Sequence, residues 1–246
     1  MPFIAFILWP VLIAAASAAG ASDGHFEYRA YSFHGATAHF GVWLPPGYKS
    51  RHDWPAILYL HGADESGSDG RAPMRVGLGQ ALSSHPSEWP FVVIVPQKPS
   101  DHEEWWEEED LTLDVVRRAV HEFHLDARKL ALVGVSQGGH GAWMLGARHP
   151  TMWSCLVPIS SYGRPRTIAP RVARLPVWAF HGDKDDVVNP AEAKSIVAAI
   201  QAEHKRLDLD IDTRLTVLPS AGHDAWDAAF ANPELPRWIL AQSKRP

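Results

Sequence analysis

Short apolar runs recur along the chain, and segments with helical periodicity or turn residues separate them. Runs of this length, bounded by Gly, Pro or polar residues, are typical of buried strands. We expect such strands at residues 56–60, 91–95, 130–135, 156–159, 177–180 and 209–218. Two alternating segments, 26–33 and 37–44, flank a turn at His34 and Gly35 and predict a hairpin.

Residues 111–123 form the clearest predicted helix. Leu111, Val115 and Val116 share one face of this segment, whereas Arg117 and Glu122 lie on the other. Further helices are predicted at 139–149, 190–203 and 233–241. Strands that alternate with helices indicate an α/β fold, in which helices cover both faces of a mostly parallel sheet. We expect the hairpin to form an antiparallel N-terminal edge, and residues 22–246 to form a single domain.

The first residues differ in pattern from the rest of the chain. Positions 3–13 are almost continuously apolar, and positions 14–21 are small residues. Ala16-Ser17-Ala18 and Ala19-Gly20-Ala21 both fit a small-x-small cleavage site, so residues 1–21 are predicted to be a secretory signal peptide. An uncleaved membrane anchor is the alternative, although the apolar run is short for a span of about 20 residues. We expect a secreted or periplasmic protein with no stable membrane association after cleavage.

Composition narrows the function classes further. The chain has 246 residues and a formal net charge of -5, and it has no long basic block, so nucleic-acid binding is not expected. Cys155 is the single cysteine, so no intramolecular disulfide can form, and its apolar neighbours predict a buried, inert thiol. No H-E-x-x-H or clustered Cys/His pattern occurs, so we expect neither a metal nor a cofactor. The sequence does not indicate an oligomeric state.

The pentapeptide Gly134-Val135-Ser136-Gln137-Gly138 carries the first chemical signal. It lies between a predicted strand and a predicted helix. This is the context in which G-x-S-x-G forms a nucleophile elbow, a sharp turn that exposes the serine hydroxyl. The glycines are required because a side chain there would collide with the neighbouring strand or helix. Ser136 is therefore the candidate nucleophile.

A serine nucleophile needs a histidine base and a carboxylate that orients the histidine. In an open parallel sheet these residues follow the carboxyl ends of strands. After the predicted strand 177–180, three acids compete for the orienting role: Asp183, Asp185 and Asp186. After the last predicted strand comes His223, the candidate base.

The order Ser136, aspartate, His223 is that of the α/β-hydrolase superfamily. The chain resembles its secreted esterase branch, whose members are described as predicted peptidases, polyhydroxybutyrate-depolymerase-like or feruloyl-esterase-like proteins. The resemblance extends over residues 60–240 and rests on these segments: 60–63 (LHGA), 95–97 (VPQ), 134–139 (GVSQGG), 177–188 (VWAFHGDKDDVV), 222–227 (GHDAWD) and 233–240 (PELPRWIL).

The resemblance also suggests roles for single residues. The pattern H-G-x-x-D-x-x-V implies Asp185 as the triad acid, with Asp183 as the alternative. The oxyanion hole is expected to use the backbone N–H of Gln137, and the resemblance adds that of Ala63. The family often continues H-G-A-G-E-R-G, whereas this chain has Asp64 and Ser66 in place of the second glycine and the arginine.

Aromatic residues provide candidate walls for a substrate cleft, because pockets favour aromatic linings. Trp105 and Trp106 are adjacent on a polar, acidic loop and cannot both point into one core, so at least one is predicted to line the cleft. Trp226 follows His223 closely and is a second candidate. His61 and His181 each end a strand and are expected to be structural.

These residues together predict a secreted serine carboxylesterase that acts on small, plant-derived or polysaccharide-linked esters through an acyl-enzyme. Two alternatives remain open at this point. One is a serine peptidase of the same fold, suggested by the names of relatives. The other is a binding protein that keeps the scaffold without catalysis.

Overall fold

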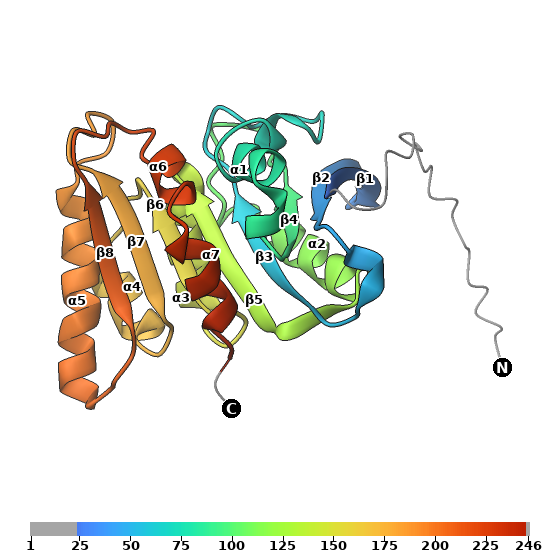
Figure 1. Cartoon of the computed structure of the whole chain (residues 1–246). Helices are drawn as coiled ribbons and strands as arrows, with labels where there is room; N and C mark the ends of the chain where they lie inside the picture. Colours follow the sequence, from blue (N-terminus) through green and yellow to red (C-terminus); the bar gives the residue numbers. More distant parts are fainter. Residues whose placement is uncertain (1–23, 245–246) are drawn as a thin grey trace, which may run out of the picture.

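The computed structural model describes residues 24–244, which form one eight-stranded sheet with helices on both sides (Figure 1). The strand order is β1-β2-β4-β3-β5-β6-β7-β8. The strands are β1 (His25–Phe33), β2 (Ala36–Leu44), β3 (Trp54–Leu60), β4 (Val92–Pro96), β5 (Leu125–Val135), β6 (Leu156–Ile159), β7 (Val177–Gly182) and β8 (Thr213–Leu218).

Strand directions confirm the expected mostly parallel sheet. Pairs β4·β3, β3·β5, β5·β6, β6·β7 and β7·β8 are parallel, whereas β1·β2 and β2·β4 are antiparallel. The hairpin therefore forms the antiparallel edge. In the centre, Gly134 of β5 pairs with Leu60 of β3 and with Pro158 of β6, which places the end of β5 between two parallel neighbours.

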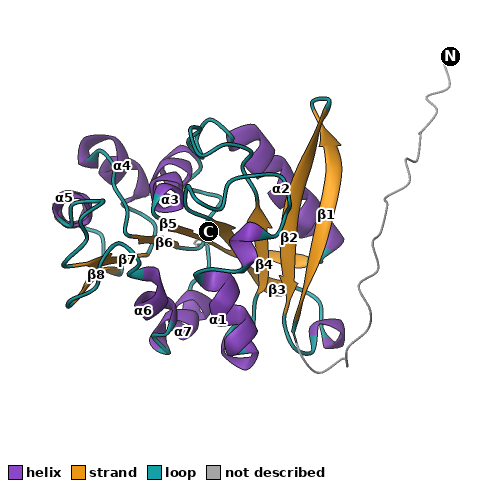
Figure 2. Cartoon of the chain, turned by 90° about the horizontal axis from the view of Figure 1, so that it is seen from above, coloured by secondary structure: helices purple, strands orange, loops and turns teal. Residues whose placement is uncertain are grey.

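Helices cover the two faces unequally. Figure 2 shows α1, α6 and α7 on one side of the sheet and α2, α3, α4 and α5 on the other. The helices are α1 (Leu78–Ser84), α2 (Glu109–Glu122), α3 (Gln137–Arg148), α4 (Pro165–Val172), α5 (Ala191–Leu207), α6 (Trp226–Phe230) and α7 (Glu234–Ala241), with short 3-10 turns η1 (Tyr48–Ser50), η2 (Ala72–Met74) and η3 (Pro86–Glu88).

Alternation along the central strands builds two hydrophobic cores, one on each face. Ala56, Leu58 and Leu60 of β3 belong to the core under α2, α3 and α5, whereas Ile57 and Tyr59 belong to the core under α1, α6 and α7. Successive side chains of a strand point to opposite faces, so a fully apolar strand packs on both. All seven residues of β3 are buried.

The structure extends some predicted elements and adds others. β5 begins at Leu125 rather than at 130, because Leu125 pairs with Trp54 before the ladder shifts register. Helix α5 continues to Leu207 and ends on Asp208, which adopts a left-handed conformation, so β8 starts only at Thr213. Helices α1, α4 and α6 were not expected, because each is short and Pro165 and Pro170 obscure the periodicity of α4.

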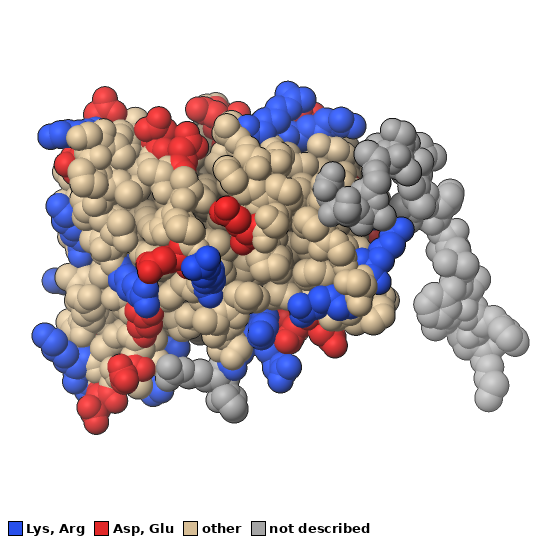
Figure 3. Space-filling view, viewed as in Figure 1, with Lys and Arg blue, Asp and Glu red and all other residues tan. Residues whose placement is uncertain are grey.

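The surface of the protein carries charged side chains of both signs (Figure 3). On the face formed by α1, α6 and α7, basic and acidic side chains are intermixed (Figure 3). Between residues 24 and 244, no helix has both the length and the apolar character needed to cross a membrane. The predicted signal peptide, residues 1–21, lies outside the described residues. Cys155 is fully buried as expected, and burial raises the pKa of its thiol to about 12.

Candidate active site

The turn between β5 and α3 holds Ser136 in a strained conformation. Its φ of 53° and ψ of -119° lie in a region that L-residues rarely adopt. A Cβ added to Gly138 would lie 2.0 Å from the Leu60 carbonyl oxygen, and one added to Gly134 would lie 2.0 Å from that of Gly138. The glycines of the motif are therefore needed for backbone to approach backbone at the elbow.

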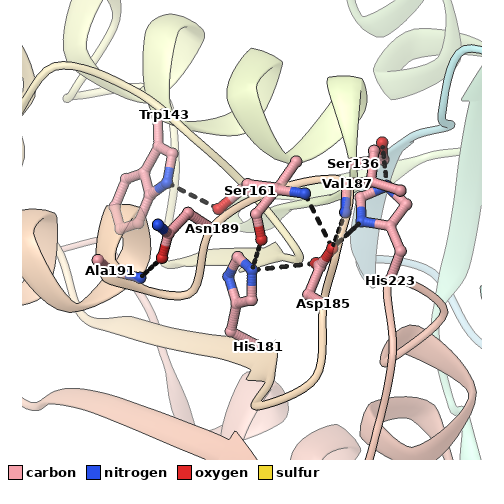
Figure 4. A network of polar contacts seen from close by, with 10 residues as sticks. Ser136, Trp143, Ser161, His181, Asp185, Val187, Asn189, Ala191 and His223 are labelled. Carbon is pink, nitrogen blue, oxygen red and sulfur yellow. Dashed lines mark hydrogen bonds and ion pairs between the residues drawn. The ribbon is translucent and has the colours of Figure 1, made fainter.

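The structure brings Ser136, His223 and Asp185 into one hydrogen-bonded chain (Figure 4). Ser136 Oγ lies 2.8 Å from His223 Nε2, and His223 Nδ1 lies 2.9 Å from Asp185 Oδ2 and 3.0 Å from Oδ1. The three residues follow β5, β8 and β7, at the carboxyl edge of the sheet. The Asp185 side chain is fully buried, whereas that of His223 is 18% exposed.

The environment of Asp185 favours its ionised form. Burial acts to raise the pKa of this carboxyl, but the Val188 amide and His223 outweigh burial and hold the pKa below its usual value. Oδ1 accepts the N–H groups of Val187 at 3.0 Å and Val188 at 2.9 Å. An ionised carboxylate only accepts hydrogen bonds, so His223 carries its proton on Nδ1 and presents a bare Nε2 to Ser136.

The competing acids have other places in the structure. Asp183 accepts the backbone N–H of Ser220 at 2.6 Å and so joins the loop after β7 to the loop after β8. Asp186 is exposed at the surface. Of the three acids after β7, Asp185 is the one that contacts His223, as the motif register suggested.

Side chains at the end of β4 hold the loop that carries Ala63. Gln97 donates to the Glu65 carbonyl at 2.9 Å and accepts the Gly70 N–H at 2.6 Å. The buried ammonium of Lys98 donates to Ser66 Oγ at 2.8 Å. Ser66 thus replaces the arginine of the related pattern with a hydroxyl that accepts a bond from Lys98.

His61 has a structural place beneath this loop. The Lys98 amide donates to its Nε2 at 3.2 Å, so the proton is on Nδ1, which donates to the Gly62 carbonyl at 2.6 Å. Burial lowers the pKa of His61 to about 3, which keeps the ring neutral. The ring therefore fixes the loop backbone without contributing charge.

A pocket of about 400 Å³ opens beside the serine. Its lining residues come from the elbow, from the loops after β3, β6 and β7, and from the start of α5: Ala63, Ser136, Gln137, Tyr162, Val187, Val188, Asn189 and Glu192. Ala63 and Gln137, the predicted oxyanion residues, lie in this pocket with Ser136.

Several lining residues were missed at the sequence level. Tyr162 follows β6, so inspecting every strand end would have found it. Val187 lies inside the H-G-x-x-D-x-x-V segment, but its side chain, 69% exposed, could be placed at the pocket only in three dimensions. Glu104 lies behind Tyr162 and binds both the Tyr162 hydroxyl, at 2.8 Å, and His140 Nδ1, at 3.0 Å.

The expectation for the paired tryptophans is wrong for Trp105. This side chain is fully buried, and its indole N–H donates to the His61 carbonyl at 3.0 Å. Gly141 of α3 leaves room for it, since a Cβ there would lie 2.6 Å from that of Trp105. Trp106 is half-buried beside Arg148, outside the pocket lining.

Trp226 lies close to His223 without lining the pocket. Its ring meets the His223 ring edge to face, with centroids 5.3 Å apart. This contact limits the orientations open to the imidazole. In the part of the chain that the structure describes, no group of three or more His, Cys, Asp or Glu side chains is arranged to hold a metal ion.

Comparison with known proteins shows the family to which this chain belongs. The family model described as "Putative esterase" matches residues 34–238. No curated protein matches the sequence. Among solved structures, a thermostable esterase is 20% identical with a TM-score of 0.73, over 89% of this chain and 63% of that one. This chain thus spans less than two thirds of that esterase.

Two further structures match over nearly their whole length. A feruloyl esterase module from Clostridium thermocellum, complexed with sinapinate, is 16% identical with a TM-score of 0.68, over 96% of this chain and 94% of that one. An S-formylglutathione hydrolase from Agrobacterium tumefaciens is 16% identical with a TM-score of 0.68, over 91% and 97%. At these identities the likeness shows the fold, which is the expected α/β-hydrolase fold.

Proposed function

The chain belongs to this esterase family of the α/β-hydrolase superfamily, and on that premise we propose that it is a secreted serine carboxylesterase. Its substrates are small or carbohydrate-linked esters, and Ser136, His223 and Asp185 carry the reaction. The observation behind the proposal is the hydrogen-bonded chain from the Ser136 hydroxyl through His223 to the buried Asp185 carboxylate.

The reaction has two acyl-transfer steps. His223 Nε2 takes the Ser136 proton as Oγ attacks the ester carbonyl, and Asp185 stabilises the imidazolium that forms. The imidazolium then protonates the leaving alcohol, and the acyl group remains on Ser136. In the second step His223 removes a proton from water, which attacks the acyl carbonyl carbon. The bond between this carbon and Ser136 Oγ then breaks, the acid is released, and the His223 imidazolium returns its proton to Oγ.

Charge on the carbonyl oxygen requires donors in both steps. The backbone N–H groups of Gln137, at the start of α3, and of Ala63 are the proposed donors. Both residues line the pocket with Ser136, and the bonds from Gln97 and Lys98 hold the Ala63 loop in place. Loss of one such donor typically costs about 2.7–4 kcal/mol of transition-state stabilisation.

The residues that line the pocket favour a substrate with a small group. Its walls combine an apolar side chain, Val187, with the ring of Tyr162 and the polar groups of Asn189 and Glu192. The described lining contains Glu192 and neither Lys nor Arg, so it favours neutral ester groups over anionic ones. This mixture suits a short acyl group or a hydroxyl-rich alcohol.

The direct test is Ser136→Ala, assayed on p-nitrophenyl acetate and butyrate. We expect turnover to fall by at least about 1,000-fold, as removal of a triad nucleophile does elsewhere, and fluorophosphonate labelling to disappear. Ser84→Ala, at an exposed position of α1, is the matched control and should behave as the parent. Turnover retained by Ser136→Ala would refute the proposal, and faster release from aminoacyl amides than from esters would favour a peptidase.

Export is tested separately. N-terminal sequencing of protein produced from the full chain in a secreting host should give a start after Ala18 or Ala21, with the product outside the cytoplasm. A product that retains Met1 and sediments with membranes would instead support the anchor alternative.

A further inference from the structure

A second histidine contacts the Asp185 carboxylate from inside the protein. His181, the penultimate residue of β7, is fully buried. Its Nε2 lies 3.0 Å from Asp185 Oδ2 and 3.0 Å from the Val188 carbonyl oxygen. Figure 4 shows Asp185 between the His181 and His223 rings, each of which presents one nitrogen to it.

The neighbours of His181 define where its proton lies. The Val188 carbonyl and the ionised Asp185 carboxylate only accept hydrogen bonds, so Nε2 carries a hydrogen. Nε2 donates this hydrogen to the Val188 carbonyl, and Asp185 Oδ2 lies 3.0 Å from the same nitrogen. Nδ1 is buried and has no hydrogen-bond partner among residues 24–244. The ring thus makes polar contacts with the acid loop through Nε2 alone.

The Nε2–H group of His181 attaches this ring to the loop that carries Asp185. The N–H groups of Val187 and Val188 bind Oδ1, whereas His181 Nε2 donates to the Val188 carbonyl and contacts Oδ2 at 3.0 Å. Carboxylate and loop backbone are therefore attached to the same imidazole. Rotation of the Asp185 side chain away from His223 would break the His181 contact as well.

We propose that His181 is a positioning residue, which holds Asp185 in the rotamer that faces His223 and thereby acts on the reaction through Asp185. The inference rests on the proposed function, because it assigns His181 a part in the same triad. If His181 merely filled space, its substitution would affect folding, and the effect would be the same whether or not Asp185 is present.

Two substitutions separate the donor from the volume of the ring. In His181→Gln, the amide nitrogen can occupy nearly the position of Nε2 and keep its N–H. In His181→Phe, the ring volume stays and the donor is lost. We expect kcat of the Gln variant within about threefold of the parent, and kcat of the Phe variant reduced about tenfold or more with KM unchanged, as for loss of a buried donor in contact with a charged group.

A double-mutant cycle tests the route through Asp185. In an Asp185→Ala background, His181→Phe should cause no further loss of kcat. His204→Phe, which removes another buried imidazole near the end of α5, is the control and should leave kcat unchanged in both backgrounds. Equal losses for the Gln and Phe variants, no loss for either, or an additive cycle would each overturn the proposal.

Nitrogen-15 NMR of the unaltered protein supplies a readout that does not depend on the variants folding. His181 should show a protonated Nε2 and a bare Nδ1 at neutral pH, and a protonated Nδ1 would overturn the proposal. If Ser136→Ala retains full turnover, the proposed function itself fails. If that variant is inactive while His181→Phe matches the parent, only the role of His181 fails.

Discussion

The Tyr162 hydroxyl donates a 2.8 Å hydrogen bond to Oε1 of Glu104, which joins the loop after β6 to the loop before α2. Burial raises the pKa of Tyr162, so its hydroxyl remains a donor. Burial acts to raise the pKa of Glu104 too, but the bonds from His140 and Tyr162 outweigh it and keep the carboxyl ionised. Tyr162, which lines the pocket, is therefore hydrogen-bonded to the charged carboxylate of Glu104.

Tyr162→Phe removes this attachment while the ring stays in the pocket. Because the hydroxyl is engaged with Glu104 rather than with the reacting atoms, we expect KM to rise about 3- to 10-fold, the usual effect of losing one such bond, and kcat to change less than about twofold. Tyr48→Phe removes a 3.2 Å bond to the Phe123 carbonyl, away from the pocket, and is the control. A fall in kcat alone would contradict this account.

Gly138 and Gly146 both lie in α3, but we expect their substitution by alanine to lower the free energy of unfolding by different amounts. In Gly138→Ala the new Cβ meets the Leu60 carbonyl at 2.0 Å, whereas in Gly146→Ala it meets the end of the Leu156 side chain at 2.7 Å. A side chain can move and backbone cannot, so Gly138→Ala should lower the free energy of unfolding by about 3 kcal/mol or more and Gly146→Ala by about 1 kcal/mol. Urea unfolding measures both, and equal losses would contradict the prediction.

The architecture could be predicted because each of its signals is local. Apolar runs revealed the buried strands, and strand–serine–helix spacing revealed the elbow at Ser136. The choice of Asp185 over Asp183 came from a family pattern rather than from local chemistry, since both acids occupy the same loop. Only the fold shows that Asp183 binds the Ser220 amide while Asp185 reaches His223.

Side-chain direction in loops was the part that the sequence could not supply. Trp105 lies in an acidic loop that suggests exposure, yet it is buried because Gly141, 36 residues away, leaves space for its ring. Tyr162 and Val187 line the pocket from two different loops, and no local pattern joins them. Such contacts depend on how the strands are ordered in the sheet rather than on any single segment.

Glu65 lies in the loop that carries Ala63, and we expect its carboxyl to make the free energy of unfolding depend on pH. Burial raises the pKa of its carboxyl, and neighbouring Asp64 raises it further. A carboxyl whose pKa is higher in the folded state stabilises the fold below its ordinary pKa, and this contribution is lost as pH rises through the folded value. Glu65→Gln is neutral at every pH, so it should be more stable than the parent at pH 7.

The advantage of Glu65→Gln should shrink as pH falls from 7 toward 4, because Glu65 then becomes protonated in the parent as well. Urea unfolding at several pH values measures the difference in free energy of unfolding. Glu88→Gln, at an exposed position of η3, removes the same charge outside this loop and is the control. A Glu65→Gln advantage that grew on acidification would reverse the sign and refute the interpretation.

The backbone N–H of Val187 is hydrogen-bonded, whereas its side chain is exposed in the pocket lining. Substitution of this side chain therefore tests how the pocket selects esters. The Val187 N–H is bound to Asp185 Oδ1 at 3.0 Å, whereas its side chain is 69% exposed in the pocket lining. Val187→Ala keeps the N–H and removes two methyl groups. Since burying one methylene contributes about 0.8 kcal/mol, the ratio of kcat/KM for butyrate to that for acetate should fall about 3- to 10-fold.

Leu240→Ala removes exposed apolar surface on α7, outside this pocket, and should leave the butyrate-to-acetate ratio unchanged. If Val187→Ala lowers kcat/KM equally for both esters, the side chain acts on the acid loop rather than on the substrate. If the ratio falls as expected, Val187 contacts the acyl chain, and the loop that holds Asp185 also selects the ester.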